Sequence, residues 1–518
     1  MGVRDDLLAR GYFPAELPPP FTTATVPGVA AEVIAVGRVK LPHGVPGTFN
    51  LARQGTLRRK LAMCNPIHQI HLCDWIERNF PKLEALFAGS RLSRSVPVED
   101  RRRAFRWRTV DVRVARAVAR SSARAEVNTD IAQFYASTYT HSLDWAIEGR
   151  EAAKARWKAH GPRSPGSEVD ELVRAGQDGQ SVGLPIGPDT SLLLAEALLC
   201  AVDASVQETR ALAKVRGFRL VDDYELAFSS RAQADEALAT VQARLAEYEL
   251  YLNPRKTKVH ELPRPLEESW VTQLKGIGVT GTGKQQQRDL LRLYDTATEL
   301  AAVHPEQHVM SYALGVVRES AVRIDTGNWP LFQGMLLGSV VSTPGLLTAV
   351  RPILLAYRDE GYAIDDDALR AIIDALVREH TPLRHSSEVA QALWTAIEFG
   401  YDLDDALART LAETDDASIA LLALDARERG LIARAALDTS TWEASVTAEG
   451  LWKASWLFVY EATRRGWIVG GEDAKVRADP WFAPLFKADV AFYDTAKRTA
   501  LPRVPAPPVD PARRYVAG

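Results

Sequence analysis

Residues 218–228 of the chain read Phe-Arg-Leu-Val-Asp-Asp-Tyr-Glu-Leu-Ala-Phe. The adjacent aspartates Asp222 and Asp223 interrupt a largely apolar run that favours strands. Such a run predicts two strands joined by a tight turn, with both carboxylates at its tip. A solvated turn explains an isolated pair of aspartates. Burial of two neighbouring carboxylates, in contrast, is costly unless cations or hydrogen-bond donors meet them.

A third carboxylate changes the interpretation of this pair. Asp130 comes at the end of another short apolar strand, in Val-Asn-Thr-Asp-Ile over residues 127–131. Three carboxylates on neighbouring strand ends form a hard-oxygen site that suits two Mg²⁺ ions. Because Mg²⁺ prefers six oxygen ligands, we expect the main-chain carbonyl of Ile131 to contribute as well. The pattern therefore predicts a site for nucleotidyl transfer.

Two more segments complete an ordered series. The loop Gly-Leu-Pro-Ile-Gly-Pro-Asp-Thr-Ser, residues 183–191, lies between the two aspartate segments and leads into an apolar helix. The segment Leu-Asn-Pro-Arg-Lys-Thr-Lys-Val, residues 252–259, follows them. This order resembles motifs A, B, C and D of the reverse transcriptase palm. The Tyr-Thr-His-Ser-x-x-Trp pattern at residues 139–145 and the 183–191 loop resemble bacterial defence-associated reverse transcriptases of the abortive-infection (Abi) type.

This resemblance implies roles for individual residues. The implied catalytic residues are Asp130, Asp222 and Asp223, the metal ligands are Asp130, Ile131 and Asp222, and the nucleotide-binding residues are Tyr135, Gly183, Pro185 and Lys256. Tyr135 would stack under the sugar and exclude a 2′-hydroxyl, and Lys256 or Lys258 would approach the leaving pyrophosphate. The chain departs from the pattern at Leu220, where Tyr or Phe is usual, and at Ile186, where Gln is usual. Both departures leave the carboxylates intact and bear on template and primer handling.

The resemblance also implies a function and partners. It implies a Mg²⁺-dependent DNA polymerase in anti-phage defence that uses dNTPs, works without a template, and assembles as a homo-oligomer. The single-stranded DNA product would be attached to a tyrosine, for which Tyr460, Tyr493 and Tyr515 are the candidates. One alternative is a templated reverse transcriptase that uses a partner non-coding RNA. Another is a non-catalytic binding scaffold derived from a palm.

Bulk properties restrict the partners and the location. No apolar run approaches the ~20 residues that span a membrane. The chain has three cysteines, Cys64, Cys73 and Cys200, too few for a disulfide framework, so we expect a cytoplasmic protein. The net charge is −3, yet residues 1–125 hold 21 Lys and Arg against 10 Asp and Glu. This asymmetry is typical of a surface that binds phosphates. The alternative is a solvated helix face, which is the usual explanation for clustered charges in a protein.

We expect an α+β fold with reverse-transcriptase-like fingers and palm over residues 1–287. An all-α, HEAT-like domain over residues 288–518, ending in a Pro-rich tail, would follow. Helical periodicity predicts the segments Leu290–Val303, Leu346–Tyr357, Asp367–Arg378, Glu388–Phe399, Ala406–Glu413 and Ala417–Arg427. Elsewhere we expect a strand at Ala31–Val39, helices broken at Pro66 and Pro81, a loop at Gly161–Gly179 and a strand at Trp270–Val279. In the basic stretch Arg91–Arg124, where Val110, Val112 and Val114 alternate with polar residues, we expect finger strands and a helix. Arg94, Arg101 and Arg103 are candidates for contacts with the triphosphate, and Cys64, His68, His71 and Cys73 are a weak candidate zinc set.

Overall fold

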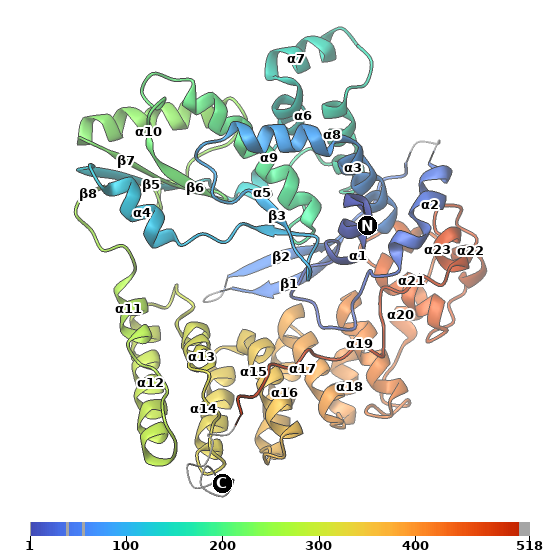
Figure 1. Cartoon of the computed structure of the whole chain (residues 1–518). Coiled ribbons are helices and arrows are strands. Elements are labelled where there is room, and N and C mark those ends of the chain that lie inside the picture. Colours follow the sequence, from blue (N-terminus) through green and yellow to red (C-terminus); the bar gives the residue numbers. More distant parts are fainter. Residues whose placement is uncertain (1, 38–40, 54–56, 507–518) are drawn as a thin grey trace, which may run out of the picture.

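A computed structural model describes residues 2–37, 41–53 and 57–506 of the chain (Figure 1). The fold is mixed α+β, mostly helical with small antiparallel sheets. The strands are β1 (Gly47–Ala52), β2 (Arg58–Met63), β3 (Pro97–Glu99), β4 (Phe105–Trp107), β5 (Ala125–Asp130), β6 (Arg216–Leu220), β7 (Asp223–Phe228) and β8 (Lys258–Glu261). The helices up to the last strand are α1 (Val3–Arg10), η1 (Val26–Val29), α2 (Ala30–Val36), α3 (Pro66–Gly89), α4 (Val112–Arg120), α5 (Phe134–Ser137), α6 (His141–Glu148), α7 (Arg150–Lys158), α8 (Pro165–Ala175), α9 (Asp189–Gln207) and α10 (Arg231–Ala246).

The central sheet has four antiparallel strands in the order β6-β7-β5-β8. In its register, Asp130 at the end of β5 pairs with Asp223 at the start of β7. Because side chains alternate along a strand, the two faces of this sheet carry different residues. Arg219 and Tyr224 pair on one face, and both are fully buried. Phe218 pairs with Glu225 on the other face, which is also the face of Asp130 and Asp223.

Helices cover the sheet on both sides. The helix α9 is buried along nearly its whole length, as expected for a helix that is apolar all round, and it packs against α3, α6 and α10. The helix α10 packs on β5, β7 and β8. The helix α4 contacts β6 and β7, where Arg116 forms a two-bond ion pair with Glu225.

The second part of the described chain is helical (Figure 1). Its helices are α11 (Ser269–Lys275), α12 (Gly283–Val303), α13 (Val309–Glu319), α14 (Trp329–Ser342), η2 (Pro344–Leu346), α15 (Leu347–Asp359), α16 (Asp366–His380), α17 (Ser386–Phe399), α18 (Asp405–Ala412), α19 (Ala417–Glu428), α20 (Ser440–Ser445), η3 (Glu449–Trp452), α21 (Trp456–Arg465), α22 (Asp473–Arg477) and α23 (Ala483–Lys487). Successive helices pack in series, for example α12 on α13, α14 on α15 and α16 on α17. The six helices expected from periodicity are confirmed, with ends shifted by at most two residues except that α12 begins at Gly283, seven residues before the expected Leu290.

The two ends of the described chain pack together. Phe21 pairs with Tyr493 in an isolated β-bridge, and the Trp456 indole donates to the Met63 carbonyl at 2.8 Å. Arg58 on β2 holds Glu388 on α17 through two hydrogen bonds. The expected boundary at residues 287/288 stays a prediction, and these contacts show that the segment before it packs extensively against the segment after it.

Several expected elements are wrong. Ala31–Val36 lies in helix α2, and residues 38–39 of that expected strand lie outside the described residues. Within Gly161–Gly179 the structure has helix α8, which begins with a capping box between Ser164 and Ser167. The expected strand at Trp270–Val279 begins as helix α11. The helix α3 starts at Pro66, as expected, but continues through Pro81. The finger strands and helix expected within Arg91–Arg124 are confirmed as β3, β4 and α4, although Val112 and Val114 lie in the helix and not in a strand.

Candidate active site

The three aspartates meet at one end of the central sheet. Asp130 and Asp223 are partners in the β5–β7 register, and Asp222 occupies the turn between β6 and β7. The amide of Ile131 donates to the Asp222 carbonyl at 3.2 Å, which ties the turn to the end of β5. Val221 adopts a positive φ of 53°, a conformation that costs free energy for a β-branched residue. The turn is thus held in a conformation that presents its carboxylates.

The exposure of the three carboxylates differs. Asp130 is buried, with 5% of its surface exposed, whereas Asp222 is half-buried and Asp223 is exposed. Burial and the nearby carboxylates of Asp130 and Asp223 raise the pKa of Asp222 to about 7. Burial and Asp130 also raise the pKa of Asp223. The cluster therefore holds more negative charge than its surroundings neutralise.

A single ammonium group lies against this cluster among the described residues. Lys256 Nζ is 2.7 Å from Asp130 Oδ2, and the hydrogen bond to Asp130 raises the lysine pKa. The Asn253 side chain also donates to Asp130 Oδ2, at 3.3 Å. Hard-oxygen donors with excess negative charge fit a divalent cation such as Mg²⁺. The residues that would hold it are Asp130 and Asp222.

The loop at residues 183–191 is joined to the segment after Asp130. Leu184 N donates to the Tyr135 carbonyl at 2.7 Å, and Gly183 N donates to the Thr138 carbonyl at 2.8 Å. Gly183 has a positive φ of 98°, a conformation that residues other than glycine rarely adopt. Burial, and then the charge of Asp222, raise the pKa of Tyr135. The structure therefore brings Tyr135, Gly183 and the aspartates close together, whereas Pro185 borders a small hollow beside His68 and Thr190.

The arginines proposed for the triphosphate have other surroundings. Arg103 forms an ion pair with the buried Asp189 and donates to the carbonyls of Phe13 and Gly187. It therefore fixes the start of α9 and is not free to bind a phosphate. Arg94 donates to main-chain carbonyls and lines a groove beside β6. The side chain of Arg101 is exposed.

One basic residue near the site was not singled out from the sequence. Arg59 on β2 is close enough to Asp222 and Tyr135 for their charges to affect its pKa. Burial and the charge of Arg53 lower that pKa, and Asp222 opposes the change. The basic run Arg58-Arg59-Lys60 was the available signal, but the sequence alone did not place this strand beside Asp222.

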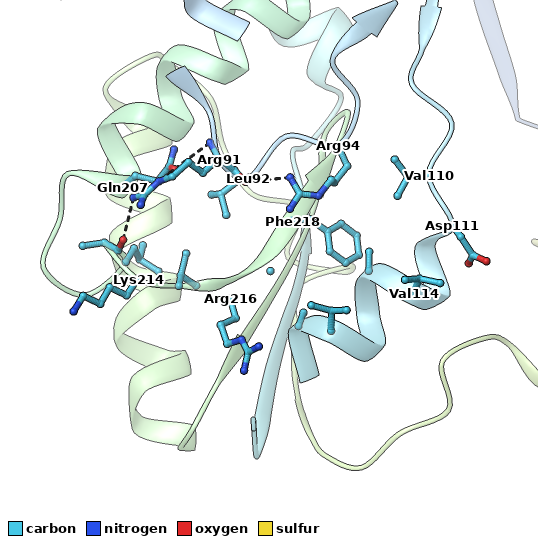
Figure 2. Close-up of a pocket in the computed structure, with 17 residues that line it drawn as sticks. Arg91, Leu92, Arg94, Val110, Asp111, Val114, Gln207, Lys214, Arg216 and Phe218 are labelled. Atoms are coloured by element: carbon cyan, nitrogen blue, oxygen red, sulfur yellow. Dashed lines mark hydrogen bonds between the residues drawn. The ribbon is translucent and has the colours of Figure 1, made fainter. Parts of the chain in front are cut away.

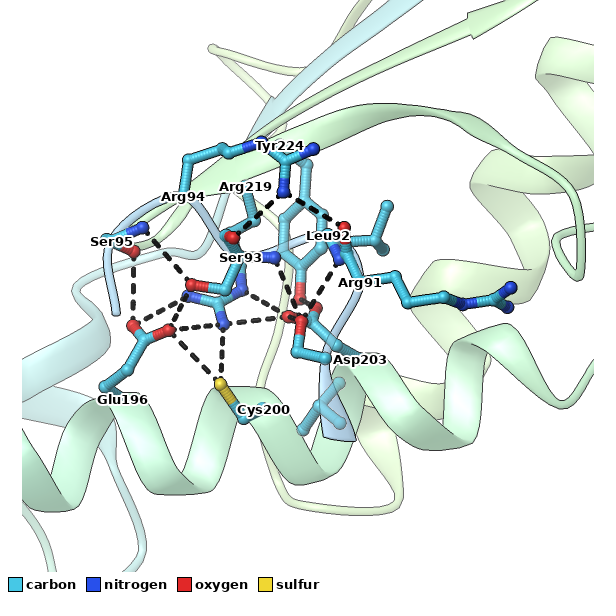
Figure 3. A network of polar contacts seen from close by, with 12 residues as sticks. Arg91, Leu92, Ser93, Arg94, Ser95, Glu196, Cys200, Asp203, Arg219 and Tyr224 are labelled. Atoms are coloured by element: carbon cyan, nitrogen blue, oxygen red, sulfur yellow. Dashed lines mark hydrogen bonds and ion pairs between the residues drawn. The ribbon is translucent and has the colours of Figure 1, made fainter. Parts of the chain in front are cut away.

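A buried ion network supports the aspartate turn from below (Figure 3). Arg219 of β6 is fully buried and donates to Glu196 at 3.0 Å and to Asp203 at 2.9 Å, both from α9. The hydroxyl of Tyr224 donates to Asp203 at 2.8 Å. The Ser95 hydroxyl donates to Glu196 and accepts from Val221 N at 2.8 Å. The network therefore connects the helix, both strands of the hairpin and the turn that carries Asp222.

The other expected site residues lie elsewhere. Tyr460 and Tyr493 are fully buried, and their hydroxyls donate to the Val490 carbonyl and to Asp425. Because both phenols are enclosed in the C-terminal core, neither is placed to receive a nucleotide. Tyr515 lies outside the described residues. Lys258 on β8 pairs with Asn128 and is exposed.

The weak zinc set does not form a metal site. Among the described residues, the grouping whose ligand atoms come close enough for a metal is His380, His385 and Glu388, not the four expected residues. His68 instead bonds to the Pro42 carbonyl at 2.8 Å, and Cys73 accepts from the Gln69 amide. Both cysteines of the set are buried and free.

Comparisons with known proteins give a distant similarity. No protein-family model matches the chain, and no curated protein matches it. The chain is similar to apo telomerase from Candida tropicalis, with 11% identity, a TM-score of 0.33, and coverage of 76% of this chain and 68% of that one. It is also similar to telomerase from Candida albicans in complex with the TWJ fragment of telomeric RNA, with 12% identity, a TM-score of 0.30, and coverage of 76% and 67%. In the part of the chain that the structure describes, no helix has the length and apolar character to cross a membrane.

Proposed function

We propose that this protein is a Mg²⁺-dependent nucleotidyltransferase that joins deoxynucleotides as a reverse-transcriptase-like DNA polymerase. One observation carries the proposal. Asp130 and Asp223 are paired residues of β5 and β7, and Asp222 occupies the turn between β6 and β7. Burial and the two neighbouring carboxylates raise the pKa of Asp222 to about 7. A purely structural cluster would be expected to have enough cations or donors to offset its charge. Here Lys256 alone forms an ion pair with the three carboxylates among the described residues.

The residues divide the chemistry among them. Asp130 and Asp222 hold the metal, and Asp223 adds negative charge from the exposed side of the same turn. When bound there, Mg²⁺ would supply charge neutralisation at the triphosphate and would lower the pKa of the attacking hydroxyl. The exposed Lys256 lies beside Asp130, and we assign it to donate a proton to the leaving pyrophosphate. Tyr135 and Gly183 border the sugar and base of the incoming nucleotide.

The resemblance to Abi-type enzymes supports the finer parts of the proposal. These are a role in anti-phage defence, untemplated synthesis of single-stranded DNA from dNTPs, and a homo-oligomeric state. Burial of Tyr460 and Tyr493 removes two candidates for a tyrosine that carries the product. Among the tyrosines near the site, Tyr251 is 59% exposed, and its carbonyl accepts from Ala132 N at 2.8 Å, two residues after Asp130. We therefore add Tyr251 to Tyr515 as a candidate.

Incorporation of labelled dNTPs tests this function. We expect Asp222→Asn to reduce incorporation at least about a thousandfold, because a neutral amide cannot replace a metal-binding carboxylate. Asp235→Asn, an exposed carboxylate on α10 that pairs with Arg231, is the matched control and should retain activity. Wild-type incorporation by a folded Asp222→Asn protein would rule the assignment out.

The same assay without primer tests attachment to a tyrosine. Label that migrates with the denatured protein, and disappears in Tyr251→Phe or Tyr515→Phe, would identify the priming residue. Extension of an added primer without any label on the protein would exclude protein priming. The polymerase assignment would survive that second outcome.

A further inference from the structure

A groove of about 720 Å³ lies beside the edge strand β6 (Figure 2). Its floor includes Phe218, and α4 contributes Val114 and Val118 to one wall. Both valines are 60% exposed, and Ala119 is the buried residue of α4. Exposed apolar side chains that gather in a concave surface are typical of a binding site.

Four cationic side chains line this groove: Arg91, Arg94, Lys214 and Arg216. Arg91 donates to Gln207 at 2.8 Å and to the Ala213 carbonyl at 3.0 Å, and Arg216 donates to the Ser122 hydroxyl at 2.7 Å. All these acceptors are uncharged. None of the four cations forms an ion pair within the described parts of the chain.

The acidic residue in the lining does not compensate this charge. Asp111 caps the start of α4 and pairs with Arg113 at 2.9 Å. Arg113 also lowers the pKa of Asp111 to about 2, so Asp111 stays ionised with its own partner. The groove is therefore a positive surface whose cations remain available to an anion from outside.

The position of the groove connects it to the candidate active site. Phe218 lies on the same face of the sheet as Asp130 and Asp223, as its pairing with Glu225 shows. It precedes Asp222 by only four residues, the last two of which form the turn, so the two residues lie at most about 14 Å apart. A chain that leaves the aspartates along β6 therefore reaches the groove without crossing to the other face.

We propose that this groove binds one or two nucleotides of a single-stranded nucleic acid that extends from the active site. Lys and Arg without acidic partners bind phosphates, and apolar side chains cover the faces of unpaired bases. The volume lies in the range of small-molecule pockets, which accommodates a strand and excludes a duplex. The four cations stand on different sides of the groove and do not converge on one point (Figure 2), which favours successive phosphates of a strand over one triphosphate.

Oligonucleotide binding by the full-length protein tests this site. The probe is a fluorescent single-stranded 12-mer, measured by anisotropy in EDTA without dNTPs, so that turnover plays no part. We expect Lys214→Gln combined with Arg216→Gln to weaken binding about tenfold or more. We also expect the slope of log K against log salt to fall by about 1.4, because each lost phosphate contact on a single strand removes about 0.7.

The matched control replaces two exposed cations on α12, Lys284→Gln with Arg292→Gln, which also lack ion pairs in the described structure. This control should bind like the wild type. Unchanged affinity and slope in the groove variant, or an equal loss in the control, would overturn the proposal. Displacement of the 12-mer by free dNTP at comparable concentration would also overturn it, since that outcome identifies a nucleotide site.

The inference deepens the proposed function, but the two can fail separately. Binding that depends on the groove in a protein without incorporation activity would leave the groove assigned and the polymerase refuted. Incorporation that depends on Asp222, with binding that ignores Lys214 and Arg216, would give the reverse result. A Val114→Asp variant adds a second test, because a carboxylate in the apolar wall should repel phosphates and weaken binding.

Discussion

At the scale of single residues, the three aspartates differ although they share one site. Asp130 has two partners: Lys256 Nζ lies 2.7 Å from its Oδ2, and the side-chain amide of Asn253 donates to the same oxygen at 3.3 Å. Asp222 has no cation within ion-pair distance among the described residues, and burial beside two carboxylates raises its pKa to about 7. Asp222 is therefore the residue most sensitive to pH and metal.

Metal-free stability should show this sensitivity. Because the pKa of Asp222 is higher in the folded state than its ordinary value, the folded protein binds more protons over pH ~4–7. The contribution of Asp222 to stability is therefore present at low pH and is lost as the pH rises towards 7. We expect the Tm in EDTA to fall more between pH 5 and 8 for the wild type than for Asp222→Asn. Mg²⁺ should raise the wild-type Tm at pH 8. The same pH dependence in both proteins would contradict this explanation.

Sugar discrimination should depend on Tyr135. The loop at Gly183–Leu184 is tied to the segment that carries this tyrosine, so the ring is held near the aspartates. We expect Tyr135→Val to raise incorporation of ribonucleotides relative to deoxyribonucleotides, because the 2′-hydroxyl no longer meets the ring. A competition assay with paired dNTP and rNTP measures the ratio, and Tyr139→Phe serves as a control. An unchanged ratio would show that another residue excludes the hydroxyl.

The aspartates of the site could be predicted from the sequence, whereas Arg219 was missed, and the difference has a physical reason. Asp222 and Asp223 stand out because carboxylates are unusual inside a strand-forming run. Arg219 in the same run was passed over, since its partners Glu196 and Asp203 belong to another segment. Those two acids are seven residues apart on an apolar helix, which places them on one face. That spacing was the signal that could have revealed the network.

At the scale of elements, the local sequence pattern predicted the wrong secondary structure where tertiary packing or a helix cap determined the conformation. The segment at α8 contains glycines and prolines that favour a loop, yet Ser164 and Ser167 form a capping box and Pro165 fits the first turn. The segment at α2 has β-branched residues but buries Ala30 and Val33 as a helix. Longer periodic helices were predicted correctly because each has a full apolar face.

Arg219 should be essential for the hairpin that carries the aspartates. Removal of its charge leaves Glu196 and Asp203 buried without a cation, which costs about 3–5 kcal/mol. We expect Arg219→Met to lower the free energy of unfolding by about that amount, measured by urea denaturation. Adding Glu196→Gln and Asp203→Asn should restore part of the loss, because the buried charges are then removed. A triple variant no more stable than Arg219→Met would show that the ion pairs are not the cause.

At the scale of the whole molecule, the first and last segments share one core. Phe13 contacts the rings of Trp456 and Phe492 at centroid distances of 6.3 Å and 6.0 Å, and Tyr12 contacts Phe492 at 6.2 Å. The sequence suggested two consecutive domains because segments with helical periodicity dominate after about residue 288. Contacts between residues more than four hundred positions apart leave no local pattern in the sequence, so the packing of the first segment against the last could not be predicted.

If the chain is divided at the expected boundary, we therefore expect the first fragment to fold only when the second fragment is present. A fragment of residues 1–287 exposes the apolar surface that Phe13, Phe49 and Met63 bury in the whole chain, so we expect it to aggregate or to lack a cooperative unfolding transition. Co-expression with residues 288–518 should yield a complex, because the interface includes the Trp456–Met63 hydrogen bond and the Arg58–Glu388 ion pair. Size-exclusion chromatography and thermal unfolding of each preparation measure both outcomes. As a control, Glu449→Gln removes an exposed ion pair with Lys453 in the second fragment and should leave assembly unchanged. A first fragment that folds cooperatively by itself would show that the two segments are separable domains and that their contacts add little to stability.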